Sequence, residues 1–285
     1  MRPEMDFDFS LILCTLNRTK EVDDFLRSLA EQPPELNLEL IVVDQNGDDR
    51  LDDVLAPYLN RFALKRIRTS PGLSRARNIG LREVSGRIVA FPDDDCIYPP
   101  GLLKRIAAAF AEDPGMDGLS TLVTDSGGQF SAGGRMYRHP CRITARNVWW
   151  CGVSPSIFVR REAAAGVFFD ETLGVGSGTI FGSGEETDYL LALMEAGKRL
   201  EYRPDLTVLH PRFSGPWLSG RGMLYGCGMG RVLRKHGRSF PTAAYYACLQ
   251  LVRAAQSFVL FRFGKMCFHL AMSAGRIRGY LAKPS

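Results

Sequence analysis

RIVAFPDDDC, residues 87–96, is the stretch that decides the fold. Residues 87–91 are typical of a short buried strand, and three consecutive aspartates follow them after Pro92. Carboxylates packed this closely repel one another, so a folded protein keeps them together only beside a cation or strong hydrogen-bond donors. Because ligands gather at the carboxyl ends of strands in open α/β sheets, this stretch predicts both an α/β fold and the position of its site.

The aspartate run favours a divalent cation. Asp93, Asp94 and Asp95 offer hard oxygen ligands rather than sulfur. Such ligands suit Mg²⁺ or Mn²⁺, and either ion would bridge to a phosphate. The expected cofactor is therefore Mn²⁺ or Mg²⁺. A solvated acidic turn is the alternative explanation for these three residues taken alone.

Strand and helix patterns alternate on both sides of this stretch. Apolar runs predict strands at 9–14, 38–43, 63–67, 87–91, 117–124, 156–160, 199–202 and 206–209. Helical spacing predicts helices at 20–31, 51–59, 72–84, 101–112 and 185–197, and residues 125–137 form a Gly-rich hairpin or loop. Alternation of this kind indicates βαβ units and a largely parallel sheet.

Composition excludes several classes of protein. The 285 residues are 45% hydrophobic and 24% charged, which is ordinary globular usage and excludes a disordered or collagen-like chain. The seven cysteines are scattered and contain no CxxC pair, so neither a disulfide framework nor a zinc site is expected. The N-terminal MRPEMDFDFS carries acids and no long apolar run, so we expect no secretory signal and a cytoplasmic location. Dinucleotide and P-loop fingerprints are missing from the sequence.

Other polar residues follow the ends of the predicted strands. Asp44 ends the second strand and would enter the same crevice as the aspartate run, where it could accept a hydrogen bond from a base or a ribose. The following Asn46-Gly47 also makes a turn, and the two roles are compatible. After the first strand come Thr15, Asn17 and Arg18, which either cap the next helix or line a nucleotide crevice.

Three further features supply candidate catalytic groups. Arg77, followed by Asn78, offers a planar fork for a base carbonyl or a phosphate, with a surface arginine as the alternative. The loop GSGEETD, residues 182–188, delivers carboxylates to a helix start, where they are either a general base or ordinary helix-dipole partners. His210 ends a strand and is either structural or a further ligand of metal or phosphate.

Five stretches in register resemble a known family. They are LILCTLNR at 11–18, LELIVVDQN at 38–46, GLSRARNIGL at 72–81, GRIVAFPDDDCIYPPGLL at 86–103 and FGSGEETDYLLAL at 181–193. Together they resemble the bacterial type of inverting GT-A glycosyltransferases of family 2. The resemblance implies a Rossmann-like nucleotide-diphospho-sugar transferase domain at 8–212, with a mixed, mostly parallel sheet flanked by helices. Residues 213–285 would then be a basic, hydrophobic C-terminal helical extension.

The resemblance also implies roles for single residues. Thr15, Asp44 and Arg77 match positions that hold the base, and Asp94 matches a ribose contact. Asp93 and Asp95 form the D-x-D pattern, with Asp95 as the direct metal ligand.

The family's catalytic base departs from its usual form here. Where the family normally has Glu-Asp, this chain has Glu185-Glu186, with Asp188 two residues on. The base is therefore Glu186 in the favoured assignment and Glu185 in the second.

The implied reaction moves a sugar from a nucleotide sugar, expected to be a UDP-sugar, to a hydroxyl of a saccharide or lipid-linked acceptor with inversion. Synthesis of a surface polysaccharide or glycolipid is the expected setting. One alternative is a nucleotidyltransferase that makes sugar nucleotides, but TLNRTKEV, residues 15–22, lacks the Gly-rich basic loop that such enzymes usually show. The other alternative is a non-catalytic protein that binds a membrane or a polyanion.

The C-terminal region differs in charge from the rest of the chain. Residues 211–285 carry 12 Lys and Arg and no acid, whereas residues 1–210 carry all 31 acids. The basic residues lie among aliphatic runs, which favours an anionic membrane over nucleic acid. Helical spacing places Arg262, Lys265, His269 and Arg276 in one stripe, as in a helix lying in a membrane interface at the inner face of the plasma membrane. Packing on the catalytic domain or in a homo-oligomer is the alternative.

Overall fold

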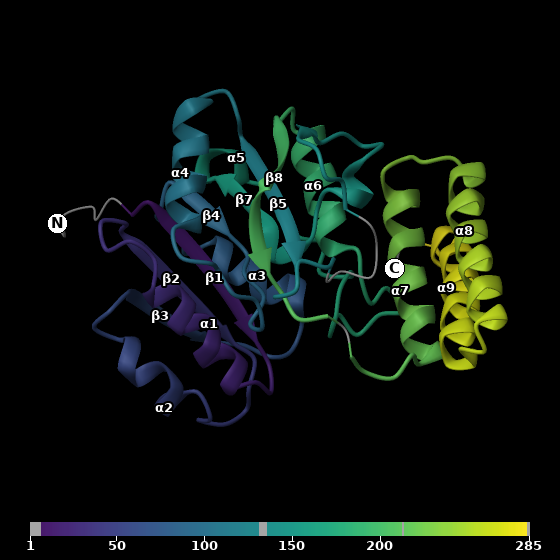
Figure 1. Ribbon diagram of the computed structural model, residues 1–285, viewed down its shortest axis with the longest axis horizontal. Coiled ribbons are helices and arrows are strands. Elements are labelled where there is room, and N and C mark those ends of the chain that lie inside the picture. The colour runs from purple at the N-terminus through teal and green to yellow at the C-terminus, as the bar shows by residue number, and fades with distance from the viewer. Residues whose placement is uncertain (1–6, 131–135, 213, 284–285) are drawn as a thin grey trace. The chain divides into compact units, whose positions relative to one another are not determined.

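The computed structural model describes residues 7–130, 136–212 and 214–283. Its centre is a mixed eight-stranded sheet with the order β3-β2-β1-β4-β7-β5-β8-β6 (Figure 1). The strands are β1 (Phe9–Thr15), β2 (Leu38–Asp44), β3 (Ala63–Arg68), β4 (Ile88–Ala90), β5 (Gly118–Thr124), β6 (Cys141–Arg142), β7 (Ile157–Arg160) and β8 (Leu200–Leu209). The helices are α1 (Lys20–Ala30), α2 (Asp52–Leu55), α3 (Leu73–Leu81), α4 (Leu102–Glu112), α5 (Arg161–Ala164), α6 (Glu185–Glu195), α7 (Ser219–Lys235), α8 (Phe240–Val259) and α9 (Phe263–Leu281).

The sheet register brings the predicted polar strand ends to one edge. β1 runs parallel to β2 and β4, with Thr15 opposite Asp44 and with Cys14 bridged to Asp93. β7 is antiparallel to both β4 and β5, and β5 is parallel to β8. Two reversals restore the direction, so β8 ends at the same edge as β1, β2 and β4. Residue His210, directly after β8, therefore reaches the edge where the aspartate run lies.

Three parts of the predicted element map are corrected by the structure. The two strands predicted at 199–202 and 206–209 form one strand, β8, because a register shift against β5 between Thr121 and Leu122 absorbs the break. The helix predicted at 51–59 is α2 followed by a 3₁₀ turn at Ala56–Tyr58, where Pro57 lies. The two-residue β6 has no sequence signal. Within the predicted hairpin or loop at 125–137, Thr124 bridges Phe130, and residues 131–135 lie outside the described residues.

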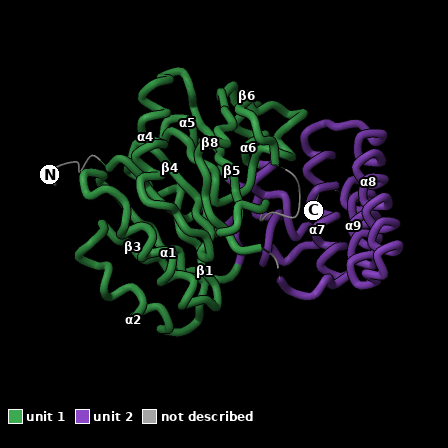
Figure 2. The backbone as a smooth tube through the Cα atoms, viewed as in Figure 1, with its two compact units in different colours: residues 1–71, 76–168, 189–213 green, residues 72–75, 169–188, 214–285 purple. Residues whose placement is uncertain are grey.

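The chain forms two compact units (Figure 2). Unit 1 comprises the described residues of 1–71, 76–168 and 189–213, and it contains the whole sheet. Unit 2 comprises those of 72–75, 169–188 and 214–285. Residue 213, where the predicted extension begins, lies outside the described residues, so that boundary stays a prediction.

The core of unit 1 follows from the apolar strands. β1 is buried along its whole length, as a central strand covered on both faces must be. Helix α1 places Val22, Phe25 and Leu29 on one face, and that face packs into the same core. Phe25 meets Tyr98 edge to face, with ring centroids 5.5 Å apart. This rigid core fixes the strand ends on which the site is built.

In unit 2, α9 packs against both α7 and α8 (Figure 1). A stripe of glycines on α7 lets α9 approach very closely: a Cβ on Gly226 would overlap the Met272 carbonyl oxygen, and one on Gly275 would lie 3.0 Å from the Cys227 nitrogen. Gly275 therefore serves this contact inside a continuous α9. In the described residues, no helix is both long and apolar enough to cross a membrane.

The predicted basic stripe of α9 does not form one exposed face. His269 and Arg276 are buried, at 6% and 9% exposure, while Arg262 is exposed. With its amide nitrogen toward His269, Gln250 of α8 donates to Nδ1 at 2.8 Å, and its oxygen accepts from Arg276 at 2.9 and 3.0 Å. Two residues of the predicted stripe, His269 and Arg276, therefore join α9 to α8.

Acidification should weaken unit 2 through His269. Burial, and then the charges of Arg253 and Lys265, lower the pKa of His269 to about 4 from its usual value of 6.5. The unfolded chain binds the proton first as pH falls, so the stability from the neutral ring is present above pH 6.5 and lost toward pH 4. We expect wild type to lose about 2 kcal/mol more unfolding free energy between pH 7 and pH 5 than His269→Gln. Urea titrations measure this, with the exposed His139→Gln as control; equal pH slopes for wild type and His269→Gln would contradict it.

Candidate active site

The aspartate run lies in a turn after β4, at the edge where β1 and β2 end. Asp93 bridges Cys14, and the Cys96 N–H donates to the Asp93 carbonyl at 3.2 Å, which closes the turn. Asp94 is buried, whereas Asp93 and Asp95 are half-buried. The run is therefore not the solvated acidic turn that was its alternative explanation.

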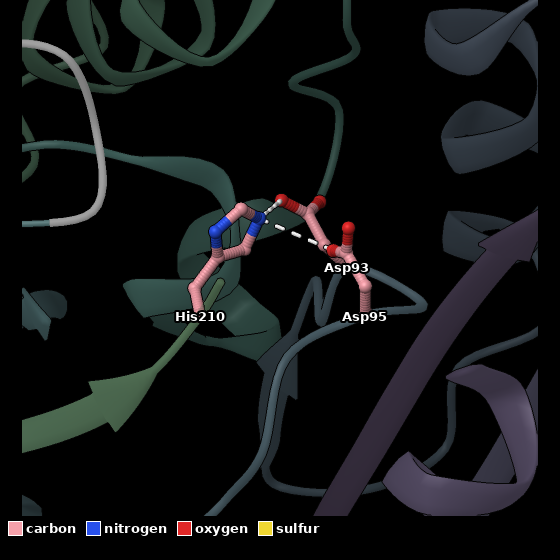
Figure 3. A group of neighbouring side chains, drawn as sticks. All are labelled: Asp93, Asp95 and His210. Atoms are coloured by element: carbon pink, nitrogen blue, oxygen red, sulfur yellow. Dashed lines mark ion pairs between the residues drawn. The ribbon is translucent and has the colours of Figure 1, made fainter. Parts of the chain in front are cut away.

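Asp93, Asp95 and His210 form a group that could hold a metal ion, with their ligand atoms all within 4.8 Å of one another (Figure 3). His210 Nε2 lies 3.1 Å from Asp95 Oδ1 and 3.7 Å from Asp93 Oδ2. Burial alone would lower the pKa of His210, but the hydrogen bond to Asp95 and the charge of Asp93 outweigh it and raise that pKa. Burial raises the pKa of Asp93. Burial acts in the same direction on Asp95, but His210 and Arg18 outweigh it and hold the pKa of Asp95 below its usual range.

The donor set of this group fits Mn²⁺ or Mg²⁺. His210 Nδ1 lies 2.8 Å from the Pro211 carbonyl oxygen, so in the neutral ring Nδ1 donates there and Nε2 keeps its lone pair toward the aspartates. Two carboxylates with one imidazole suit Mn²⁺ well, and the carboxylates alone suit Mg²⁺.

Arg18 lies between two of the aspartates. Its NH1 nitrogen is 2.5 Å from Asp94 Oδ1 and 2.6 Å from Asp95 Oδ2. Thr15 donates from Oγ1 to the other oxygen of Asp94 at 2.7 Å. Burial raises the pKa of Asp94 to about 6, although Thr15 and Arg18 act in the opposite direction. The positive charge of Arg18 thus offsets the repulsion between the carboxylates of Asp94 and Asp95.

Asp44 is completely buried at the end of β2 and is held from two sides. The Arg66 guanidinium donates to Oδ2 from Nε at 2.9 Å and from NH2 at 2.6 Å. Asn46 donates to Oδ1 from its backbone at 2.9 Å and from its side chain at 2.7 Å. Asn17 has a left-handed backbone with φ of 60°, and its N–H donates to Asn46 Oδ1 at 2.6 Å. Asn17, Asn46 and Asp44 therefore belong to one hydrogen-bonded cluster, and Thr15 lies opposite Asp44 in the strand register.

Arg77 and Asn78 lie buried on α3, so the surface alternative for Arg77 is excluded. The Arg77 guanidinium lies 3.3 Å from Asp93 Oδ1 and donates to Ser154 Oγ. Arg66 is a site neighbour that the sequence did not single out. The sequence does contain a signal for Arg66. This residue lies near the end of the strand predicted at 63–67, and that strand follows the one that ends at Asp44.

The candidate bases begin α6, in unit 2. Asp188 is buried and bound twice: Lys235 donates to Oδ2 at 2.9 Å, and His236 Nε2 lies 2.8 Å from Oδ1. Glu185 is buried beside Gly174, whose built Cβ would lie 3.0 Å from the Glu185 carboxyl carbon. Glu186 is only half-buried. Asp188 is thus buried and paired, and Glu186 is the most exposed of the three carboxylates.

Helix α7 holds the loop that leads to these carboxylates. The Gly182 N–H donates to the Leu224 carbonyl at 3.2 Å, and Ser183 Oγ donates to the Tyr225 carbonyl at 3.0 Å. One turn on, a Cβ on Gly228 would overlap the Ser183 backbone, lying 2.8 Å from its nitrogen. Together with Lys235 at the end of α7, these contacts fix the start of α6.

Gly228→Ala should therefore displace the loop before Glu185. We expect a loss of about 1–3 kcal/mol of stability, because only backbone atoms surround the added methyl group, and a loss of activity larger than the stability loss explains. Gly220→Ala is the matched control on the same helix, since nothing lies within 4 Å of its added Cβ. The control should be neutral or stabilising by up to about 1 kcal/mol. Thermal unfolding and turnover measure both, and a fully active Gly228→Ala would contradict the prediction.

Comparison with known proteins places this geometry in a family. The family model described as glycosyl transferase family 2 matches residues 10–165. TarS of Staphylococcus aureus, a poly(ribitol-phosphate) beta-N-acetylglucosaminyltransferase, is 35% identical over 115 residues, a match that covers 39% of this chain and only 20% of TarS.

Two solved structures share the fold. TarS residues 1–349 in complex with UDP-GlcNAc align with a TM-score of 0.61 at 16% identity, covering 93% of this chain and 90% of that one. The mannosyltransferase PcManGT of Pyrobaculum calidifontis, in complex with GDP-Man and Mn²⁺, aligns with a TM-score of 0.67 at 17% identity, covering 96% and 87%. They confirm the predicted GT-A fold class, and with the family match over more than half of its length, the chain belongs to glycosyl transferase family 2.

Proposed function

We propose that this protein transfers a sugar from a nucleoside diphosphate sugar, a UDP-sugar, to an acceptor hydroxyl with inversion, in a metal-dependent reaction. The observation that carries the proposal is the convergence of Asp44, Thr15 and the aspartate run on adjacent strand ends, with His210 closing the group. A nucleoside needs buried polar groups, and a diphosphate needs a cation beside it; this edge of the sheet offers both.

The nucleotide half of the site divides into two parts. Thr15, Asn17, Asp44, Arg77, Asn78 and Asp94 would bind the base and ribose, with Arg18 near the phosphates. Asp93, Asp95 and His210 would hold Mn²⁺ or Mg²⁺, whose charge makes the diphosphate a better leaving group.

Glu186 would act as the general base. Its carboxylate takes the proton of the acceptor hydroxyl while that oxygen forms a bond to the anomeric carbon and the bond to the diphosphate oxygen breaks. Attack from the face opposite the leaving group inverts the configuration without a covalent enzyme intermediate. Glu186 is preferred because it is half-exposed, whereas Asp188 is held by Lys235 and His236.

The relatives support the setting that the sequence implied. TarS acts on poly(ribitol-phosphate), and its structure holds UDP-GlcNAc. We propose by analogy a UDP-sugar donor and a saccharide or lipid-linked polymer acceptor, used at the cytoplasmic face of the membrane.

Thermal unfolding with nucleotide sugars tests the proposal directly. A donor at 100 times its dissociation constant stabilises the fold by about 2.7 kcal/mol, which should raise the melting temperature by about 5–10 °C. We expect this for a UDP-sugar with Mn²⁺, a smaller shift with chelator, and slow release of UDP. Release of pyrophosphate from UTP and a sugar phosphate would instead favour a nucleotidyltransferase. The absence of stabilisation by any UDP-, GDP- or dTDP-sugar would overturn the proposal.

A further inference from the structure

The turn between α8 and α9 exposes a continuous apolar surface, which we name the apolar tip. Its five side chains are 52–81% exposed, and the most exposed is Phe261 at 81%. The tip consists of Phe258, Val259, Leu260, Phe261 and Phe263. Single exposed apolar residues are normal on a soluble protein, but a contiguous group of this kind marks an interaction surface.

The apolar tip is an ordered element. The Phe261 N–H donates to the Phe258 carbonyl at 2.9 Å, and the Arg262 N–H donates to the Ser257 carbonyl at 2.8 Å. Phe261 has a left-handed backbone with φ of 55°, a conformation that glycine or asparagine would adopt at lower cost. The Phe263 ring lies edge-on to the rings of Phe258 and Phe261, with centroids 6.2 and 6.4 Å away. The turn therefore holds its aromatic rings outward in a defined arrangement.

Positive charge surrounds the apolar tip, and negative charge is missing from this part of the sequence. Arg253 and Arg262 are exposed beside it. Lys265 lies 4.9 Å over the Trp217 ring, and these two residues with Arg262 and Phe263 line a shallow groove of about 430 Å³. No Asp or Glu follows Asp205 in the sequence. The charge around the tip is thus complementary to an anionic surface.

We propose that the apolar tip docks into the surface of an anionic phospholipid bilayer. Phenylalanines enter the boundary between headgroups and acyl chains, while arginine and lysine side chains contact lipid phosphates. The sequence predicted membrane contact along the whole basic stripe of α9. Because His269 and Arg276 are buried, we place the contact at the turn between α8 and α9 instead. The proposal depends on neither the sugar donor nor the metal.

Vesicle co-sedimentation of the full chain tests the proposal. The probes are vesicles of phosphatidylcholine alone and of phosphatidylcholine with phosphatidylglycerol, at low and high salt. We expect binding to the anionic vesicles, weakened by salt. The double variant F261S/F263S should bind at least about tenfold more weakly at either salt concentration, because it removes two inserted side chains. Arg262→Glu should weaken binding mainly at low salt.

Leu281→Ser is the matched control, because Leu281 is 65% exposed on the same helix but lies at its other end, about 27 Å from the turn. It should bind like wild type. Equal binding by F261S/F263S and Leu281→Ser would overturn the proposal, as would the absence of binding to anionic vesicles. Light scattering that shows a dimer lost in F261S/F263S, without vesicle binding, would assign the tip to a second copy instead. No sugar nucleotide enters this assay, so its failure would leave the proposed function standing.

Discussion

Glu186→Gln should reduce kcat for sugar transfer by about a thousandfold, with little change in KM for the donor. The amide has the size of the carboxylate but cannot take a proton, and general base catalysis contributes about 10²–10⁴-fold to such reactions. The contacts of Lys235 and His236 to Asp188, which lie at the start of α6, involve a different side chain and should persist in this variant. Steady-state kinetics with saturating donor and acceptor measure the effect, together with melting temperatures that should not change.

Two variants on the same helix make this prediction specific. Glu195→Gln lies at the exposed end of α6 and should keep full activity. Glu185→Gln changes the neighbouring carboxylate, which is buried, and should lower stability more than Glu186→Gln does. Full activity in both Glu185→Gln and Glu186→Gln would contradict a base role for either residue. An active Glu186→Gln beside an inactive but folded Glu185→Gln would exchange the two roles.

Asp95→Ala should abolish the dependence of the reaction on divalent ions and reduce turnover by at least about a thousandfold. Asp95 is the carboxylate shared by His210 Nε2 and the Arg18 guanidinium, so its removal takes away one of three candidate ligands and leaves Arg18 paired with Asp94. Titration calorimetry with Mn²⁺ should show the loss of binding in the absence of any sugar nucleotide. Asp205→Ala, which removes an acid on β8 outside this cluster, is the control. Unchanged Mn²⁺ affinity in Asp95→Ala would remove it from the metal group.

The middle of the sheet was predictable because β1, β2 and β4 are buried on both faces. Such strands are continuous apolar runs, and the run before Asp93 and the run before Asp44 stand out without any structural knowledge. Parallel pairing of β1 with β2 and β4 then brings their polar ends together by geometry alone. His210 was predictable as a candidate because it follows an apolar run, as Asp44 and Asp93 do.

The sequence could not identify the partners that hold these residues. Arg66 meets Asp44 only through the register of β2 against β3, and Ser154 meets Arg77 across 77 positions of the sequence. Spacing also cannot say which side of a helix faces another helix. His269 and Arg276 fit an exposed basic stripe, yet they are buried against Gln250, because α8 covers that side of α9.

The contacts between α7 and the loop at 182–184 affect the design of chimaeras in which C-terminal regions are exchanged between relatives. The segment 169–188 and the helices after 214 form one discontinuous unit, joined through Ser183, Gly228 and Asp188. A chimaera that swaps only the helices would pair a foreign α7 with a native loop, and inactivity in such a hybrid would be mistaken for a wrong acceptor preference. An active chimaera has to take residues 169–188 and the helices after 214 from the same parent protein.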